Sequence, residues 1–435
     1  MSTTDPRLGA ADAAWWRMDE ASNPMVITAV LTFGAPVSHQ TLERRVRERL
    51  LPLLPFRSRL REPALGIGRP RWAPDPEFSL NRHLIRATLP APAGEAELQA
   101  LVSRLMGERL DPRHPLWRFH LIAGYQGGAA LVARIHHCIA DGMALIQLLL
   151  TLDDVPGNEG AGALACGNGT AAAVARRPAG ARAAAWAASA FGRLVLEWPD
   201  PRTALSGPLG MEKVAAWCEP FPLSELRGVA RATGSKVNDV LAAAVSGALA
   251  RYLAAGGRGV PGRGLRAVVP VNLRPADDAS LLGNRFGLVF LSLPVGVADP
   301  ARRLAGIRAE MRRLKGSAEA GVTYALLRLF GPAGRALVRF AVWFLGMKAS
   351  LVFTDVPGPR EAVTVCGAPL TRLMAWVPQS GRLSVGVSAV SYAGQVQVGI
   401  AADRGLVPNP AELVAAFRAA MDELVAAAPA ALQEA

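Results

Sequence analysis

The stretch "RIHHCIADGMALI" (residues 134–146) sets two adjacent histidines at the end of an apolar segment, and Asp141 and Gly142 follow shortly after them. Just upstream, "LWRFHLIAGY" (116–125) and "AALVARIHHC" (129–138) flank a Gly-Gly turn. This pattern predicts a β-hairpin. Asp141 stands where a helix, "DGMALIQLLL", can begin, and its carboxylate can cap that helix. Gly142 permits close approach or unusual backbone dihedrals.

The two histidines are predicted to diverge. Side chains alternate between the faces of a strand, so His137 would share a face with Ile135, and His136 with Arg134. Only a local bend or bulge would let both imidazoles enter one pocket. Histidine is the usual general base near neutral pH. A metal site is not predicted because no third ligand lies nearby. A Cys138–His137 nucleophile is disfavoured because the two side chains would point to opposite faces.

Strand-like and helix-like segments alternate through both halves of the chain. We predict a domain at 1–155, a linker at 156–205 and a second domain at 206–435, because apolar residues around 156–185 recur with no helical or strand period. The mixed order favours two α/β sandwich domains, with a ligand site at their shared interface. The predicted strands and helices span residues 24–33, 38–56, 95–110, 224–257, 264–274, 285–296, 348–359, 382–403 and 409–428.

Composition narrows the classes of partner. The chain has 435 residues, of which 51% are hydrophobic and 19% charged, so a large core is expected and global disorder is not. The net charge of +13 favours a phosphate-bearing partner: nucleic acid, anionic lipid or a nucleotide-bearing cofactor. Nucleic acid is disfavoured because zinc-finger spacing, ribonucleoprotein aromatics and a helix-turn-helix signature are all missing from the sequence.

The cysteines and the N-terminus predict a reducing, cytoplasmic setting. The four cysteines form no CxxC pair, and the N-terminus is too acidic for a signal peptide. The sequence contains no run of 18 uncharged apolar residues, so we predict no membrane span. The nearest approach, "ALVRFAVWFLGMKASLVF" (336–353), is interrupted by Arg339 and Lys348. It predicts an amphipathic or buried helix that could lie on a membrane surface.

Residues 136–142, "HHCIADG", resemble the HHxxxDG signature of bacterial wax ester synthase/diacylglycerol acyltransferases. That family is part of an acyl-CoA-dependent superfamily that includes chloramphenicol acetyltransferase, whose broader HxxxD pattern matches His137 and Asp141. Peptide-synthetase condensation domains share the signature, so the order of further matches carries the resemblance. In chain order they are "PLW" (115–117), "ND" (238–239), "VPVNLR" (269–274), "GNRFG" (283–287), "FTDVPGPR" (353–360) and "SYAGQVQVGIAAD" (391–403).

The resemblance implies two chloramphenicol-acetyltransferase-like sandwich domains with the active site in a channel between them. It implies transfer of a long-chain acyl group from acyl-CoA, as co-substrate, to a long-chain alcohol or diacylglycerol, with no permanently bound cofactor and no metal. His137 would be the general base and His136 its helper. Asn238 is the first candidate to stabilise the oxyanion, and Ser391 a weaker one.

Other matched positions are expected to bind substrate or to support the site. Related folds turn the aspartate of the signature away from the base, so Asp141 is predicted to pair with Arg274. Asp355 stands where the family usually has Asn, and a carboxylate cannot donate a hydrogen bond unless it is protonated. The remaining positions in this group are Gly142, Asp239 and the packing residues Pro115, Leu116 and Trp117.

The lipid substrates imply two further features. A long apolar channel is expected, for which residues 285–296 and 322–353 are candidates, although core packing explains them equally well. The charge of +13 suits coenzyme A phosphates and an anionic surface, so we expect peripheral association with the inner membrane or a lipid droplet.

Two alternatives remain. One is a condensation-domain-like or polyketide-associated acyltransferase, disfavoured because no carrier-protein or adenylation segment follows. The other is a non-catalytic lipid-binding protein of the same fold, against which the intact His137, Asp141 and Gly142 argue.

Overall fold

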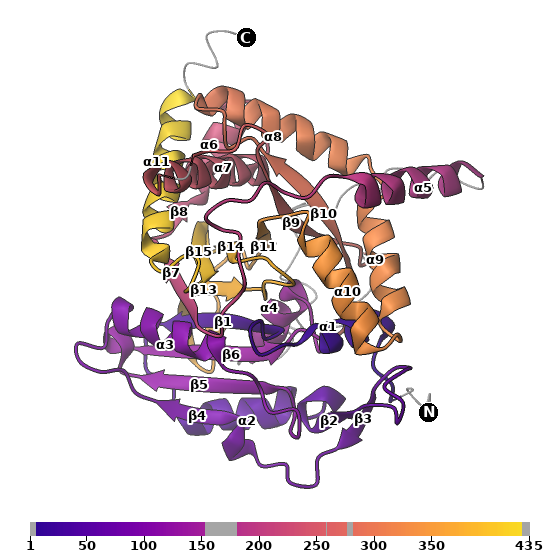
Figure 1. Cartoon of the computed structure of the whole chain (residues 1–435). Coiled ribbons are helices and arrows are strands. Elements are labelled where there is room, and N and C mark those ends of the chain that lie inside the picture. Colours follow the sequence, from indigo (N-terminus) through magenta and orange to yellow (C-terminus); the bar gives the residue numbers. More distant parts are fainter. Residues whose placement is uncertain (1–5, 153–180, 258, 276–281, 429–435) are drawn as a thin grey trace.

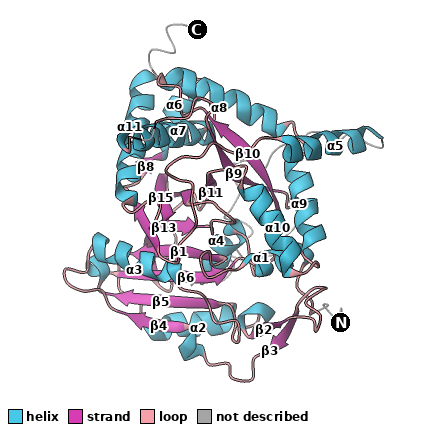
Figure 2. Ribbon diagram, in the orientation of Figure 1, coloured by secondary structure: helices cyan, strands magenta, loops and turns pink. Residues whose placement is uncertain are grey.

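The computed structural model describes residues 6–152, 181–257, 259–275 and 282–428, arranged as two halves that are each built on one large sheet (Figure 1). The first half is drawn in indigo and magenta, and the second in magenta, orange and yellow. Strands occupy the middle of each half and helices cover them (Figure 2). The predicted two-sandwich α/β fold is confirmed. The boundaries predicted for the two domains remain a prediction.

The first sheet has six strands, and two of them come from the C-terminal part of the chain. Along the sheet the strands are β12 (Thr364–Val365), β13 (Ala368–Trp376), β1 (Val26–Phe33), β6 (Ala129–His136), β5 (Trp117–Ala123) and β4 (Leu84–Ala87). β5 and β6 pair antiparallel, as the hairpin prediction requires. Every residue of β1 and β6 is buried, because both faces of these central strands are covered.

The second sheet has seven strands and mixes parallel with antiparallel pairing. In order they are β10 (Phe286–Leu293), β9 (Leu265–Asn272), β11 (Leu351–Pro357), β14 (Val385–Tyr392), β15 (Gln395–Asp403) and β7 (Lys213–Trp217), with β8 (Phe221–Pro222) paired to β15. The predicted hairpin at 382–403 is present as β14 and β15. Ala393 and Gly394 turn it with φ of 46° and 78°, a conformation that glycine adopts without strain.

Helices cover the sheets and fill the space between the halves. Those of the first half are α1 (Ala10–Met18), α2 (His39–Arg49), α3 (Glu95–Gly107) and α4 (Gly142–Leu150). Those that follow are α5 (Ala181–Leu196), α6 (Leu223–Ala232), α7 (Val237–Ala255), α8 (Pro300–Lys315), α9 (Glu319–Phe330), α10 (Arg335–Gly346) and α11 (Pro410–Ala427). A small sheet pairs β2 (Ser58–Arg61) with β3 (Arg71–Pro74), and short 3-10 turns span Leu54–Phe56, Leu80–Arg82 and Tyr125–Gly127.

Two segments differ from the sequence prediction, and a third lies largely outside the described residues. The helix predicted at 38–56 ends at Arg49, because Pro52 and Pro55 have no backbone N–H to continue it. The segment 336–353 is helical only to Gly346, because Leu351–Pro357 pairs with two strands of the second sheet. Of the predicted linker, residues 156–180 lie outside the described residues, and α5 follows them.

The core has one large apolar cluster in each half. A smaller cluster joins them, in which Trp376 on β13 lies against Trp217 on β7, with ring centroids 5.5 Å apart. No helix in the described residues combines the length and apolarity needed to cross a bilayer.

Candidate active site

His137 lies in a turn rather than on a strand. β6 ends at His136, and residues 137–139 form a turn that leads to α4. The alternation that we extended through His137 is therefore wrong by one residue at the strand end, because the backbone leaves the sheet there. The predicted divergence is nevertheless present: each imidazole has its own set of neighbours.

The imidazole of His137 is buried between aromatic rings. Trp15 stacks on it with ring centroids 4.1 Å apart and planes 8° from parallel, and Phe286 lies 5.6 Å away. Burial lowers the pKa of His137 to about 4, so the ring is neutral at physiological pH. Nδ1 is enclosed, and no hydrogen bond within the described residues reaches it. The other ring nitrogen, Nε2, is not among the enclosed atoms that lack a partner, and His137 lines the pocket described below.

His136 is held by polar groups on the other side of the turn. Its Nε2 lies 3.8 Å from a carboxylate oxygen of Asp19, and its Nδ1 accepts a hydrogen bond of 3.1 Å from the Cys138 backbone N–H. Burial alone would raise the pKa of Asp19, but the nearby His136 imidazole and a hydrogen bond from Arg109 lower it to about 2. This geometry suits a residue that supports the turn.

Asp141 is turned away from His137. Its Oδ1 accepts a hydrogen bond of 2.9 Å from the Ala144 backbone N–H, which caps α4, and its Oδ2 lies 3.3 Å from the Arg274 guanidinium. Both contacts match the sequence prediction. The same guanidinium donates to the Gly283 carbonyl at 3.0 Å, so the pair ties α4 to the second half of the molecule.

A pocket of about 820 Å³, counting its open mouth, lies between the two halves beside His137. The first half supplies Trp15 and the turn with the start of α4, including Asp141 and Gly142. The second half supplies residues of β9, β10 and β11, namely Val268, Pro270, Asn272, Phe286, Leu288, Val352, Thr354, Asp355, Val356 and Pro357. The site therefore lies at the interface of the two halves, as predicted.

Helix α1 carries two site residues that the sequence analysis did not single out. Trp15 stacks on His137, and one turn earlier the buried Asp12 accepts hydrogen bonds from the Asn284 backbone N–H at 2.8 Å and its amide at 2.7 Å. The same amide donates to the His137 carbonyl at 2.7 Å. Burial raises the pKa of Asp12 to about 6. Neither residue carried a local signal, although Asn284 lies in the matched "GNRFG" segment.

The structure does not bring Asn238 or Ser391 to His137. Neither lines the pocket among the described residues. Asn238 lies in the first turn of α7, where Asp239 accepts a hydrogen bond of 2.8 Å from the Lys236 backbone N–H and Lys315 of α8 lies nearby. Ser391 pairs in register with Pro357. The oxyanion roles expected of Asn238 and Ser391 gain no support from the pocket lining in the described residues, and they stay predictions.

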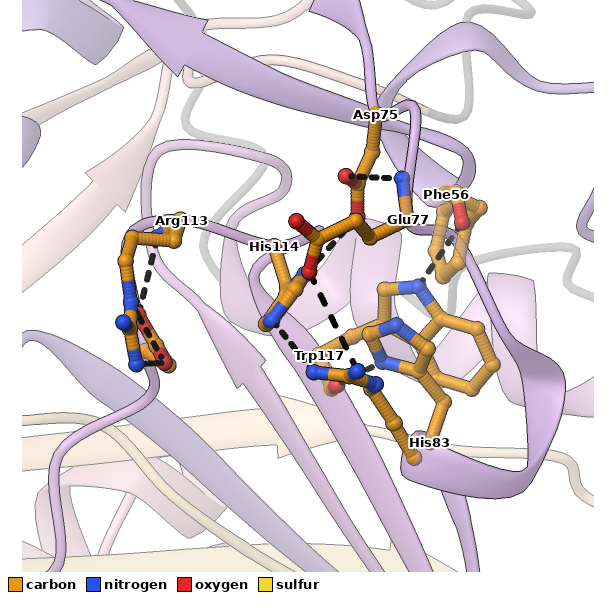
Figure 3. A network of polar contacts seen from close by, with 9 residues as sticks. Phe56, Asp75, Glu77, His83, Arg113, His114 and Trp117 are labelled. Atoms are coloured by element: carbon orange, nitrogen blue, oxygen red, sulfur yellow. Dashed lines mark hydrogen bonds and ion pairs between the residues drawn. The ribbon is translucent and has the colours of Figure 1, made fainter.

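Pro115, Leu116 and Trp117 also lie outside the pocket. Trp117 donates from its indole to the Phe56 carbonyl at 2.9 Å and stacks on His83 at 4.5 Å (Figure 3). Next to it, His114 lies 2.9 Å from a carboxylate oxygen of Asp75. Leu116 accepts a hydrogen bond of 2.9 Å from the His136 N–H through its carbonyl. This stretch packs the first half and anchors the strand that leads to the site.

Burial raises the pKa of the Cys138 thiol above its ordinary range, and the negative charges of Asp12 and Asp19 raise it further. The geometry therefore agrees with the sequence analysis in giving this cysteine no nucleophilic role.

Two sheet-centred halves with a buried histidine at their interface define a chloramphenicol-acetyltransferase-like protein. Comparison with known families makes the class specific. The model described as "Wax ester synthase/diacylglycerol acyltransferase catalytic domain" matches residues 8–161, and "WS/DGAT C-terminal domain" matches residues 282–425. The chain therefore belongs to the wax ester synthase/diacylglycerol acyltransferase family, and the prediction that it is an O-acyltransferase enzyme of that family is confirmed.

Similar proteins agree with this assignment. A probable diacylglycerol O-acyltransferase of Mycobacterium tuberculosis is 30% identical over 425 residues, which cover 92% of this chain and 90% of the relative. A second, putative one from the same species is 32% identical over 440 residues, covering 90% and 89%.

Two solved structures share the fold. The wax ester synthase/diacylglycerol acyltransferase of Marinobacter aquaeolei VT8 superposes with a TM-score of 0.71 at 22% identity, over 97% of this chain and 99% of that one. The first condensation domain of the calcium-dependent antibiotic synthetase gives 0.66 at 18% identity, over 98% and 97%.

Proposed function

We propose that the protein transfers a long-chain acyl group from acyl-CoA to a long-chain alcohol or a diacylglycerol, with His137 as the general base. The observation that carries this proposal is a neutral imidazole held at the wall of a pocket between the two halves. The alcohol oxygen would attack the thioester carbonyl while Nε2 takes its proton; the C–S bond would then break, and the coenzyme A sulfur would take this proton from Nε2 and leave as the thiol. Such a base typically contributes about 10²–10⁴-fold in rate.

A second, apolar cavity supports the choice of lipid substrates. It holds about 650 Å³ beside the pocket, and Trp15, Val268, Leu288 and Ser380 line both spaces. Its other walls are apolar side chains of α1, α9 and α10, including Leu327, Phe330, Val338, Ala341, Val342 and Leu345. Each methylene buried there would contribute roughly 0.8 kcal/mol, so a long chain gains much more than a short one.

The test is thiol release by the purified protein, with palmitoyl-CoA and either hexadecanol or diacylglycerol. We expect release that depends on the alcohol, and its loss in His137→Ala. The matched control is His39→Ala, which removes a histidine from α2, outside the pocket. No release with either alcohol across several chain lengths would reject the proposal, and full activity in His137→Ala would reject the base.

We also propose that the face formed by α5, α9 and α10 rests on a lipid surface, either membrane or droplet. Helix α10 is apolar on both sides: Val338 and Val342 line the inner cavity, while Phe340 and Trp343 are 59% and 45% exposed. Further exposed apolar side chains on or next to these helices are Phe191, Val195, Leu196, Trp198, Leu329 and Leu337. In Figure 1, α5 projects from the molecule beside α9.

Charge on the same helices supports this orientation. Arg328, Arg335 and Arg339 lie on α9 and α10; Arg335 and Arg339 also pair with Glu62 and Glu20, and a basic group near an anionic surface contributes about 1 kcal/mol at most when it is unpaired. Vesicle flotation with anionic phospholipid tests the surface. The Phe340→Ser/Trp343→Ser variant should lose binding, whereas Met211→Ser, which removes an exposed apolar side chain outside these helices, should keep it. Equal flotation of both variants would reject this face.

A further inference from the structure

Asp355 is a carboxylate without a partner in the pocket that also contains His137. It lies near the end of β11, and its neighbours Thr354, Val356 and Pro357 line the same pocket. No hydrogen bond or ion pair reaches its carboxylate from anywhere in the described parts of the chain. Asp355 is partly buried and faces a largely apolar pocket, where an unpaired carboxylate is costly, so the group favours a ligand or a proton.

Among the described residues that line the pocket with Asp355, none is a cation that would hold it ionised. From the first half, the pocket receives His137, which is neutral, and Asp141, whose charge is already paired with Arg274. From the second half it receives the amide of Asn272 on β9, and on β14 the residue opposite Asp355 is Ala389. Asp12 on α1 is the other acid near the site, and its carboxylate is occupied by Asn284.

We propose that Asp355 is a catalytic residue that works as a neutral carboxylic acid, donating a hydrogen bond to the carbonyl oxygen of the acyl group during transfer. This rests on the proposed acyl transfer. The carbonyl oxygen is the partner that gains most, because negative charge develops on it when the alcohol attacks. If Asp355 donated its hydrogen bond to the alcohol oxygen instead, that oxygen would become a weaker nucleophile. An ionised Asp355 would both lose the hydrogen bond and repel the developing charge.

The protonation behaviour agrees with this role. Burial raises the pKa of Asp355 to about 7, so the acid form is present at and below neutral pH. Because the pKa of His137 is lowered to about 4, base and acid are both in their working forms between these values. Asp12 ionises near 6, but ionisation makes it a better acceptor for Asn284 and does not weaken the site.

The experiment is the pH dependence of kcat/KM for thiol release in the wild type, Asp355→Asn and Asp355→Leu. Above pH 7 the wild type should lose about tenfold per pH unit, as the neutral acid is titrated away. Asp355→Asn keeps a donor that does not ionise, so its rate should stay level. Asp355→Leu should lose about 10²–10³-fold at all pH values, the usual effect of removing one such donor.

The control is Asp12→Asn, which removes the other acid with a raised pKa near the site and should keep the alkaline fall. The same alkaline fall in Asp355→Asn, or near wild-type rates in Asp355→Leu, would overturn the proposal while leaving the acyl transfer intact. If Asp355→Leu does not fold, the pH dependence of kcat/KM in Asp355→Asn still tests the proposal. A wild type that releases no thiol at any pH would instead reject the acyl transfer, and this inference with it.

Discussion

His136 and His137 are neighbours in the chain, yet they lie in opposite chemical surroundings. His137 is stacked on Trp15 and lines a pocket, and its Nδ1 has no hydrogen-bond partner among the described residues. His136 faces the Asp19 carboxylate and the backbone of the turn. The difference teaches that residue type alone does not make a general base, because the proposed role of His137 depends on its place at the pocket and His136 faces a carboxylate and the turn instead.

The largest effect expected from this comparison separates the two imidazoles. His137→Ala should lower kcat/KM for thiol release by about 10²–10⁴-fold, because it removes the proton acceptor. His136→Ala should act mainly on the turn and lower kcat/KM far less per folded molecule. Circular dichroism and thiol release on the same samples measure both effects. A comparable loss of rate in both variants, with both folded, would break the comparison.

The next effect concerns the aspartate four residues after His137. Asp141→Ala should lower the free energy of unfolding by about 3–5 kcal/mol, because it removes both the cap of α4 and the ion pair with the largely buried Arg274 guanidinium. Urea unfolding measures this loss. The Asp141→Ala/Arg274→Leu variant should recover part of it. A fully stable Asp141→Ala variant without activity would show that this carboxylate takes part in the chemistry.

A smaller effect follows from the buried state of His137. Its pKa is about 4 in the folded chain and near 6.5 when unfolded, so the unfolded chain binds the extra proton between these values. The stabilisation is present above pH 6.5 and is lost as the pH falls toward 4. Between pH 7 and 5 the wild type should lose roughly 2 kcal/mol more unfolding free energy than His137→Gln. Chemical denaturation measures the unfolding free energy of both proteins. An equal loss between pH 7 and 5 in the wild type and in His137→Gln would contradict a buried, neutral His137.

The smallest effect is expected at Asn238. Because this residue lies in the first turn of α7 and not at the pocket, Asn238→Ala should leave kcat/KM within about threefold of the wild type and lower stability by no more than about 1 kcal/mol. The same thiol-release assay checks this. A loss of 100-fold or more in a folded variant would restore Asn238 as a participant in catalysis.

Much of the local structure could be predicted because its causes lie within a few residues. Ser38 accepts a hydrogen bond of 3.0 Å from the Thr41 N–H and caps α2, and Asp141 caps α4 in the same way. The hairpins at 116–138 and 382–403 follow from apolar segments around turn residues. The resemblance supplied the pairing of Asp141 with Arg274, which no local pattern contains.

The rest of the site could not be predicted because it joins distant parts of the chain. Asp12, His137 and Asn284 are far apart in sequence, and their contacts carry no periodicity or spacing that a reader could detect. Asn238 was favoured for its place in a matched segment, but the direction in which α7 begins decides which side chains reach the pocket. The crossing of β13 into the first sheet is equally invisible in the sequence.

The sequence by itself determined the secondary structure around the site, the capped helix after the histidines and the class of chemistry that a neutral imidazole can perform. The tertiary structure decided which histidine faces the pocket, which carboxylate is paired and which is left without a partner. The physical reason is that burial and charge pairing depend on all the elements that surround a group, and those elements meet only when the two halves of the chain pack together.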